Sequence, residues 1–302
     1  MSLNLEALDQ EVSKEKLKLK ATISGISHSG KTGTALMLAE KLADGDWTKV
    51  LAVDVGERNG VSVYEYLGKF RTIKIPPPYT LNLITECIQY AVGKGYKVII
   101  FDSLTQFWSG VGGCLEQADK AGKNAWNKIT PILRKTMLDA LDAEIHVIFT
   151  LRQKSDKVEE VNPETGKRTS RKIGMKDDFK PDSDYDFDLC IEMDREHKAI
   201  AHKDRTRICP DNEFFDFTSE TAAQIADWTQ KGKRPINTKR ILSLFNSYSK
   251  DTKFSEKISE IMKTQTVEWK DDLIAFVDGR KPTDEKLIPA WQAVRKEVED
   301  WK

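Results

Sequence analysis

The sequence has 302 residues, of which 39% are hydrophobic and 32% charged, a composition typical of a soluble globular protein with one large domain or two ordinary ones. Lysine plus arginine and aspartate plus glutamate number 48 each, which argues against a globally basic nucleic-acid-binding protein, so any DNA contact must rest on a local patch. The four cysteines form no C-x-x-C pair, and no apolar run approaches the roughly 18 residues of a membrane span. We therefore expect a cytoplasmic protein without a zinc site, a disulfide framework or a membrane segment.

A polar segment, residues 1–16, is expected to form a short helix or arm. Its three leucines and Val12 are spaced for one apolar face. Such an arm either packs on its own chain or docks on a neighbouring subunit, and the sequence does not separate these two possibilities.

A glycine-rich turn follows, in which residues 25–32 read GISHSGKT and fit the pattern G-x-x-x-x-G-K-[ST] of phosphate-binding loops. An alternating strand precedes it and a stretch rich in helix formers follows it, which is the setting that this loop requires. Backbone N–H groups and the helix N-terminus then surround the β-phosphate, Lys31 reaches the β- and γ-phosphates, and the Thr32 hydroxyl ligates Mg²⁺. The cofactors are therefore predicted to be ATP and Mg²⁺. The residues expected to bind the nucleotide are Gly25, Ser27, His28, Ser29, Gly30, Lys31, Thr32 and Gly33.

Two later apolar runs end in acidic residues and are predicted to be buried strands. Residues 97–102 end at Asp102, which we expect to hold the Mg²⁺ shell together with Thr32. Residues 50–54 end at Asp54, and Glu57 follows shortly after. Glu57 is the candidate that orients or deprotonates the attacking water, with Asp54 as its rival. Solvated strand-end acids without a catalytic role are the alternative.

Two connecting segments lack the apolar periodicity of regular structure. Residues 108–124 are glycine-rich and expected to be mobile, and residues 152–182 are expected to form a long irregular loop. The second loop either grips a nucleic-acid backbone or is a solvated hairpin of balanced charge, because five acids accompany its cations. Its candidate DNA-binding residues are Lys167, Arg168, Arg171, Lys172 and Lys176. Between these loops, His146 lies in an apolar run and is expected to be a core or interface histidine.

Lys203 and Arg205 are two residues apart on a predicted strand and would project from one face. Such a pair can reach a phosphate held by an adjacent subunit, as an arginine finger does, or can protect a sheet edge by charge. The composition changes near residue 232, after which the chain reads as helical. We therefore predict an N-terminal arm (residues 1–16), an ATPase core (17–231) and a C-terminal helical domain (232–302).

The ordered set of phosphate-binding loop, Asp102 strand, basic loop and Lys-x-Arg strand resembles the RecA-like ATPases. More narrowly, it resembles the phage-encoded P-loop proteins of the single-strand-annealing, RecA-core type. The likeness covers residues 17–228. It implies an α/β core with a mostly parallel central sheet, to which the C-terminal helices are an extension. For a phage-encoded protein, the location would be the host cytoplasm.

The resemblance also implies roles for individual residues. The family's glutamate falls on or near Glu57, although Gly56 stands where one alignment expects it. The sensor of the γ-phosphate would be Arg152 or Gln153. Lys203 and Arg205 would act across a subunit interface. The loops at 108–124 and 152–182 would face the axis of a filament or ring and hold single-stranded DNA.

These features predict an ATPase that oligomerises on single-stranded DNA, is stimulated by it, and promotes annealing or strand exchange in recombination. Lys31, Glu57, Asp102, Lys203 and Arg205 would be its catalytic residues. The alternative is a nucleotide-dependent switch or assembly ATPase without a DNA role, whose helical C-terminal region binds a protein partner. A small-molecule kinase is a weaker third possibility, since the sequence shows no motif for an acceptor pocket or a lid.

Overall fold

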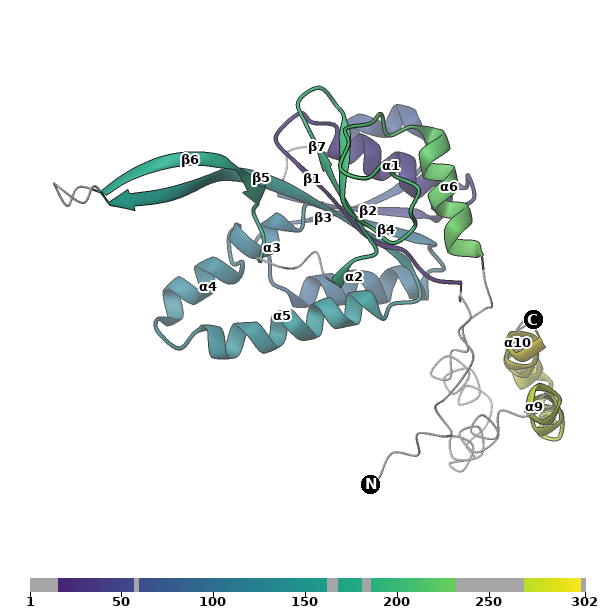
Figure 1. The fold of residues 1–302 in the computed structure, drawn as a ribbon. Coiled ribbons are helices and arrows are strands. Elements are labelled where there is room, and N and C mark those ends of the chain that lie inside the picture. Colours follow the sequence, from purple (N-terminus) through teal and green to yellow (C-terminus); the bar gives the residue numbers. More distant parts are fainter. Residues whose placement is uncertain (1–15, 57–59, 162–167, 181–185, 232–268, 300–302) are drawn as a thin grey trace, which may run out of the picture. The chain divides into compact units, whose positions relative to one another are not determined.

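The structure is a computed structural model that describes residues 16–56, 60–161, 168–180, 186–231 and 269–299 (Figure 1). The chain divides into two compact units, residues 18–229 and residues 1–17 with 230–302. The expected N-terminal arm lies almost entirely outside the described residues, as do the helices expected between residues 238 and 263.

The larger unit is built on a mostly parallel sheet in the strand order β3-β2-β4-β5-β1-β7-β8, with β6 paired to β5. Only the pairs β7–β8 and β5–β6 are antiparallel. Every residue of β1, β2 and β4 is buried, because helices cover both faces of the sheet. The predicted α/β class with a mostly parallel central sheet is confirmed. The strands are β1 (Lys20–Gly25), β2 (Val50–Val55), β3 (Arg71–Ile75), β4 (Val98–Asp102), β5 (His146–Val161), β6 (Arg168–Asp177), β7 (Leu189–Met193) and β8 (Ala199–Asp204).

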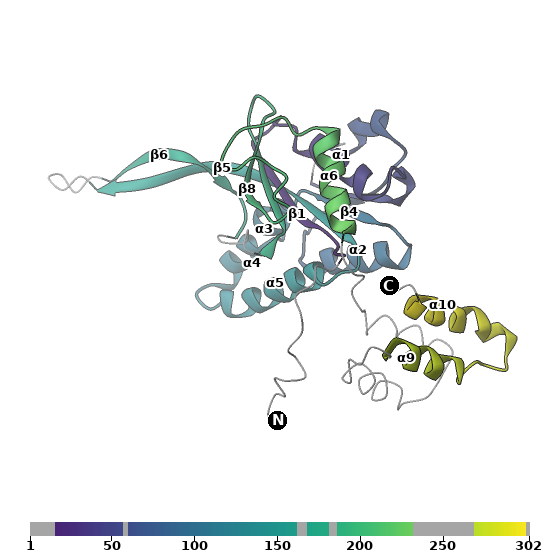
Figure 2. The ribbon, with the colours of Figure 1, turned by 45° about the vertical axis from the view of Figure 1, so that its right-hand side comes forward.

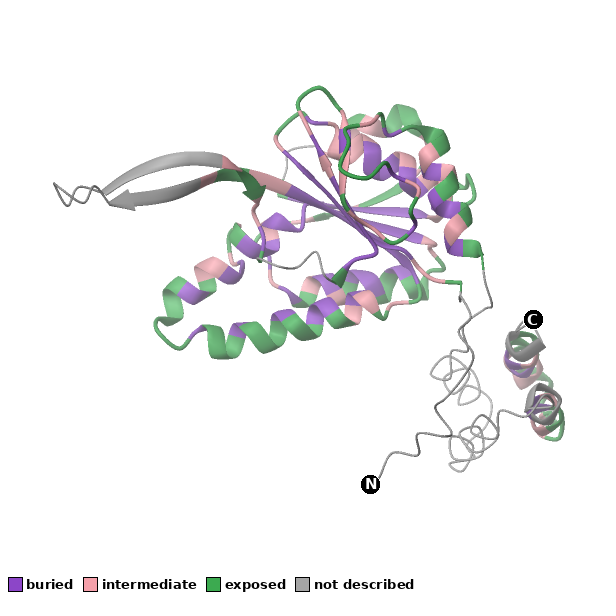
Figure 3. Ribbon diagram, viewed as in Figure 1, coloured by how far each residue is buried: buried purple, intermediate pink, exposed green. Residues whose placement is uncertain are grey.

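Two layers of helices enclose this sheet, and the core residues divide between them (Figures 2 and 3). Helices α1 (Lys31–Leu42) and α6 (Ser219–Gln230) pack on one face. Helices α2 (Asn82–Gly93) and α5 (Trp126–Leu141) pack on the other, with Pro131 in the first half of α5. Shorter elements connect them: η1 (Trp47–Lys49), η2 (Ser62–Leu67), α3 (Thr105–Ser109) and α4 (Cys114–Ala121).

Both segments expected to be irregular have regular structure. Residues 108–124 include the end of α3 and the whole of α4, so the expectation of a mobile glycine-rich loop was wrong. Residues 152–182 hold most of β5 and all of β6, which pair as an antiparallel ribbon that projects beyond the sheet (Figure 1). Because β6 pairs only with β5 among the described strands, no second layer imposes an apolar alternation on this sequence. The ribbon's tip, residues 162–167, lies outside the described part.

The smaller unit contains α9 (Trp269–Asp278), η4 (Glu285–Leu287) and α10 (Ile288–Glu299). The buried Trp291 joins the two helices, because its Nε1 donates a hydrogen bond to the carbonyl oxygen of Val277 at 2.9 Å. Within the described ranges, no helix combines the length and apolar character needed to cross a membrane.

At the N-terminal end of β1, two ionisable side chains are buried against backbone groups. His146 accepts a hydrogen bond at Nδ1 from the Leu19 N–H (2.9 Å), and burial lowers the pKa of its imidazole well below the usual value. The expectation of a core histidine is confirmed. The Lys20 Nζ donates to the carbonyl oxygens of Ala143 and Ile145, each at 2.6 Å, and burial lowers the pKa of Lys20 to about 7.

Lys20 makes the stability of the fold depend on pH. Between pH 7 and 10.5 the unfolded chain keeps the Lys20 proton that the folded chain releases, so the free energy of unfolding rises with pH in this window. The slope is at most about 1.4 kcal/mol per pH unit. A Lys20→Met variant lacks this titration, and we expect the wild type to gain stability relative to it from pH 7 to 9.5 in urea unfolding. A difference that stays constant over this range would contradict the prediction.

Candidate nucleotide-binding and catalytic site

The phosphate-binding loop connects β1 to α1 and depends on two glycines. Gly25 has φ of 150°, and a Cβ there would lie 2.4 Å from the Met193 carbonyl oxygen and 2.5 Å from Ser29 Oγ. Gly30 has φ of 93° at the start of α1, in the region that only glycine adopts readily. The tight loop therefore lies against β7, and α1 begins at Lys31.

Next to this loop is a pocket of about 450 Å³, a volume in the range of small-molecule sites. It is lined by residues of the loop, of the segment around η2, of the carboxyl end of β4, and of β5 just beyond its pairing with β4. This convergence follows from the strand order, because parallel strands end at one edge of a sheet. The lining residues are Ser27, His28, Gly30, Lys31, Thr32, Gly60, Val63, Tyr64, Asp102, Ser103, Arg152 and Gln153.

Thr32 and Asp102, predicted to hold the metal, meet in this pocket. Thr32 Oγ1 donates a hydrogen bond to Asp102 Oδ2 at 2.7 Å, although 70 positions separate them. Both groups offer hard oxygen ligands, which suit Mg²⁺. The hydroxyls of Ser29 and Ser103 are buried and have no hydrogen-bond partner among the described residues. Two further hydroxyl groups near this pair can therefore bond to a ligand. The donor set therefore fits a nucleotide-bound magnesium ion.

Thr150 is a further member of this site that the sequence analysis did not identify as one. It is fully buried on β5, and its Oγ1 donates a short hydrogen bond to Asp102 Oδ1. The two residues meet because β4 and β5 pair in parallel with Phe101 opposite Phe149. A sequence signal existed, since Thr150 closes its apolar run with a polar group, as Asp102 does.

We expect a Thr150→Val variant to require about 10- to 100-fold more Mg²⁺ for half-maximal nucleotide binding, the usual loss when a group that orients a metal ligand is removed. Valine keeps the shape of threonine but leaves Asp102 Oδ1 without this donor. A fluorescent ATP analogue titrated with Mg²⁺ measures the effect. Thr150→Ser retains the hydroxyl and serves as the control. Equal Mg²⁺ requirements for the valine and serine variants would show that Thr150 does not position Asp102.

Lys31 lies in the pocket with its ammonium held by the loop itself. Its Nζ donates to the carbonyl oxygen of Ile26 at 2.5 Å. The carbonyl oxygen is a neutral acceptor, and phosphate oxygens are charged and bind an ammonium more strongly. The Lys31 side chain is therefore already positioned beside the place where the β- and γ-phosphates are predicted to lie.

Arg152 and Gln153, the predicted sensors of the γ-phosphate, also line the pocket. The Arg152 backbone N–H donates to Thr105 Oγ1 at 2.9 Å, and its guanidinium lies 3.2 Å from the side-chain amide of Gln106. Gln153 hydrogen-bonds through its side chain to Asp177 at the end of β6. It therefore connects the pocket to the base of the β5–β6 ribbon.

The catalytic carboxylate remains a prediction. Glu57 lies outside the described residues. Its rival Asp54 is buried at the end of β2, in register with Asp102, and is not among the residues that line the pocket. The structure therefore places Asp54 on the strand next to Asp102 and three strands from β1, which leads into the phosphate-binding loop.

Lys203 and Arg205 lie toward the end of the sheet that is opposite the phosphate-binding loop along the strand direction. Strand β8 runs antiparallel to β7, so its carboxyl end lies at the same end of the sheet as the start of β1, with β7 between them. β8 ends at Asp204, so the expectation that both cations lie on the strand was wrong for Arg205. The exposed Arg205 side chain pairs through Nη1 with Asp188 Oδ1 at 2.8 Å, and Asp188 Oδ2 accepts the Lys20 N–H at 3.1 Å. Neither cation belongs to the pocket of its own chain.

Of the residues predicted to bind DNA, only the Lys176 side chain is described, and it pairs with Asp156 at 2.6 Å. Lys167 lies outside the described residues. Arg168, Arg171 and Lys172 belong to β6, but their side chains are outside the described part. At the base of the ribbon, Phe179 meets Trp108 with ring centroids 5.7 Å apart, a contact that sequence reasoning missed.

Comparisons with known proteins assign the chain to a family. Residues 17–239 match the protein family described as the AAA domain. The crystal structure of a KaiC-like protein from the hyperthermophilic archaeon Pyrococcus horikoshii OT3 is similar, with a TM-score of 0.36 and 16% identity over 62% of this chain and 79% of that chain. No curated protein matches the sequence. Since the family match spans most of the chain and includes the phosphate-binding loop, Asp102 and Thr150, the protein belongs to the AAA domain family of P-loop ATPases.

Proposed function

We propose that the protein binds and hydrolyses ATP with Mg²⁺ and assembles as a homo-oligomer, a filament or ring, on single-stranded DNA. There it would promote annealing or strand exchange in phage recombination. The metal would neutralise charge on the β- and γ-phosphates, and Thr32 and Asp102 would hold it. Lys31 would bind the same phosphates, and Arg152 or Gln153 would contact the γ-phosphate. Glu57, or Asp54, would orient or deprotonate the attacking water.

Arg205 and Lys203 would complete the site from a neighbouring subunit. Their place at the edge opposite the phosphate-binding loop supports this, because two subunits stacked edge to edge would bring the cations of one toward the pocket of the next. Asp188 binds one nitrogen of Arg205 and leaves its other donors for a phosphate. Hydrolysis would remove the group that Arg205 contacts and loosen the interface.

One observation supports the DNA role most directly: a single strand, β5, contributes residues to both the nucleotide pocket and the ribbon. Thr150 bonds Asp102, Arg152 and Gln153 line the pocket, and the ribbon pairing begins at Gln153 opposite Asp177. A change at the γ-phosphate would therefore reach the ribbon through one continuous piece of backbone. This supports stimulation of hydrolysis by DNA bound along the ribbon.

Salt-dependent retention on oligo-dT, with and without ATP and Mg²⁺, tests this proposal. We expect retention to require ATP and to weaken with salt, with a slope of about −0.7 for each phosphate contact. A variant with three ribbon cations replaced by alanine should bind more weakly and with a shallower slope. Its changes are Arg168→Ala, Arg171→Ala and Lys172→Ala. The control variant removes three exposed lysines elsewhere, and its changes are Lys69→Ala, Lys94→Ala and Lys135→Ala. Equal retention of both variants would contradict binding by the ribbon.

A nucleotide-dependent switch that acts on a protein partner is the alternative. The ion pairs Lys154–Asp178 and Lys176–Asp156 favour it, because they neutralise two cations at the ribbon base. The partner would bind the C-terminal helices. ATP-dependent assembly without any retention on oligo-dT would support this alternative over the DNA role.

A further inference from the structure

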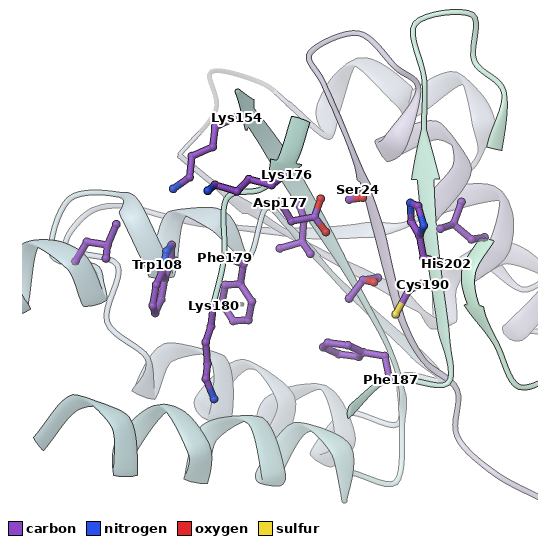
Figure 4. A pocket seen from close by; sticks show the side chains of 14 residues that line it. Ser24, Trp108, Lys154, Lys176, Asp177, Phe179, Lys180, Phe187, Cys190 and His202 are labelled. Carbon is purple, nitrogen blue, oxygen red and sulfur yellow. The ribbon is translucent and has the colours of Figure 1, made fainter. Parts of the chain in front are cut away.

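A second cavity, of about 510 Å³, lies on the sheet face opposite α1 and has no part in the ATP site described above. Its floor is formed by β1, β7 and β8, and its walls come from α3, α4 and the base of the ribbon (Figure 4). The cavity therefore lies between the two segments that are proposed to contact DNA, residues 108–124 and the β5–β6 ribbon.

The walls of this cavity are aromatic and apolar. Trp108 and Phe179 line one side with their rings 5.7 Å apart, and Phe187 lies across from them. Leu115 and Leu151 complete the apolar surface. Trp108 and Phe179 pack edge to face, and the parts of their rings that line the cavity offer an apolar, aromatic contact to a nucleobase without preference for one base.

The floor and the ribbon side of the cavity carry polar groups that match the edge of a base. Ser24 and Gln153 hydrogen-bond to the Asp177 carboxylate, and its other oxygen, Oδ1, is buried without a hydrogen-bond partner among the described residues. Burial also raises the pKa of Asp177. His202 and Cys190 lie with Ser24 on the floor of the cavity (Figure 4). Because every nucleobase carries both donors and acceptors on its edge, a base would satisfy the free oxygen of Asp177.

The mouth of the cavity carries three lysines. Lys154 and Lys176 reach over Trp108 from the ribbon, and Lys180 extends beside Phe179 (Figure 4). Lys154 and Lys176 pair with Asp178 and Asp156 at the surface, each at 2.6 Å. Exposed pairs of this kind contribute little, so a phosphate can displace the carboxylates. Lys180 makes no ion pair with another described residue.

We propose that this cavity receives one nucleotide of a single strand, with its base against the apolar wall of Trp108 and Phe179, its phosphate at the two ribbon lysines and a neighbouring phosphate at Lys180. The inference rests on the proposed DNA-binding function and adds to it. The strand would then be held by an unstacked base as well as by its backbone. A double strand, whose bases are paired and stacked, could not occupy the cavity.

Comparison of oligo-dT with an abasic oligonucleotide of equal length tests this idea, because both present the same phosphates. With ATP and Mg²⁺ present, we expect oligo-dT to bind the full-length protein at least about tenfold more tightly, as one stacked base supplies. Equal affinities would overturn the cavity proposal while leaving DNA binding intact. Absence of binding to either oligonucleotide would overturn the DNA role as well. Free dTMP that competes as well as oligo-dT would show a mononucleotide site and also overturn the proposal.

Two variants locate the effect. Trp108→Leu should remove the preference for oligo-dT over the abasic strand, and Trp108→Phe should keep most of it. Lys180→Ala should weaken binding of oligo-dT severalfold without unfolding the protein, since Lys180 is exposed, and Lys94→Ala at the end of α2 is its control. Tyr90→Leu, which removes an exposed aromatic ring on α2, is the control for Trp108. A preference that survives in Trp108→Leu with normal ATP binding would place the stacked base elsewhere and overturn the assignment.

Discussion

The Lys31→Ala variant is expected to lose nucleotide binding, with ATP hydrolysis at least about 10²- to 10³-fold slower, because removal of one preorganised donor from a polar site has an effect of this size. The ammonium lies in the pocket beside Thr32 and Asp102, where its bond to the Ile26 carbonyl oxygen holds it ready for phosphate. The methyl group of alanine cannot reach that far. Binding of a fluorescent ATP analogue and the rate of phosphate release measure the two losses.

Lys41→Ala is a matched control for this variant. Lys41 lies in the last turn of the same helix, α1, and pairs with Glu40 at the surface. Its replacement should leave both nucleotide binding and hydrolysis near the wild-type values. If Lys31→Ala hydrolysed ATP at the parental rate, the active site would have to lie outside the phosphate-binding loop.

The Arg205→Ala variant is expected to slow hydrolysis by about 10³-fold or more, the effect of losing an arginine finger, while ATP binding to the separate subunit stays unchanged. The reason is its position, since Arg205 lies at the edge of the sheet away from the pocket of its own chain. Arg207→Ala is the control, because Arg207 is also exposed and lies only two residues away.

A mixture of two inactive variants tests whether Arg205 acts between subunits. In Lys31→Ala the pocket is damaged but Arg205 is present, and in Arg205→Ala the pocket is intact. Oligomers that contain both variants should recover part of the wild-type rate, because some pockets are then intact and face an intact Arg205. No recovery in mixed oligomers, shown by separate labels to contain both chains, would exclude this role.

Local sequence was enough to predict the parts of the site that lie within one strand–turn–helix unit. The spacing of Gly25, Gly30, Lys31 and Thr32 is a property of eight consecutive residues, so the geometry of the loop follows from the order of the chain. Asp102 was predicted for a similar reason, since an apolar run that ends in an acid places a carboxylate at the edge of a parallel sheet. The buried His146 followed from its apolar neighbours.

The two segments at 108–124 and 152–182 show where local reasoning was insufficient. Glycines in the first predict mobility, but Gly112 and Gly113 lie in the turn that leads from α3 into α4. The second has no apolar alternation, yet its backbone forms a regular ribbon through hydrogen bonds between its own two strands. Alternation of apolar and polar residues arises when one face of a strand is buried. A ribbon that no other layer covers has no such face, so its sequence does not alternate.

Sequence by itself therefore determined the phosphate-binding loop of this protein and the acid that is proposed to hold its metal, because each depends on residues close together in the chain. Tertiary structure alone decided which distant residues meet. Thr150 reaches Asp102, Trp108 reaches Phe179, and Arg205 lies away from its own pocket. The physical reason is that strand order, strand direction and register are settled by packing across the whole sheet, and no short stretch of sequence contains them.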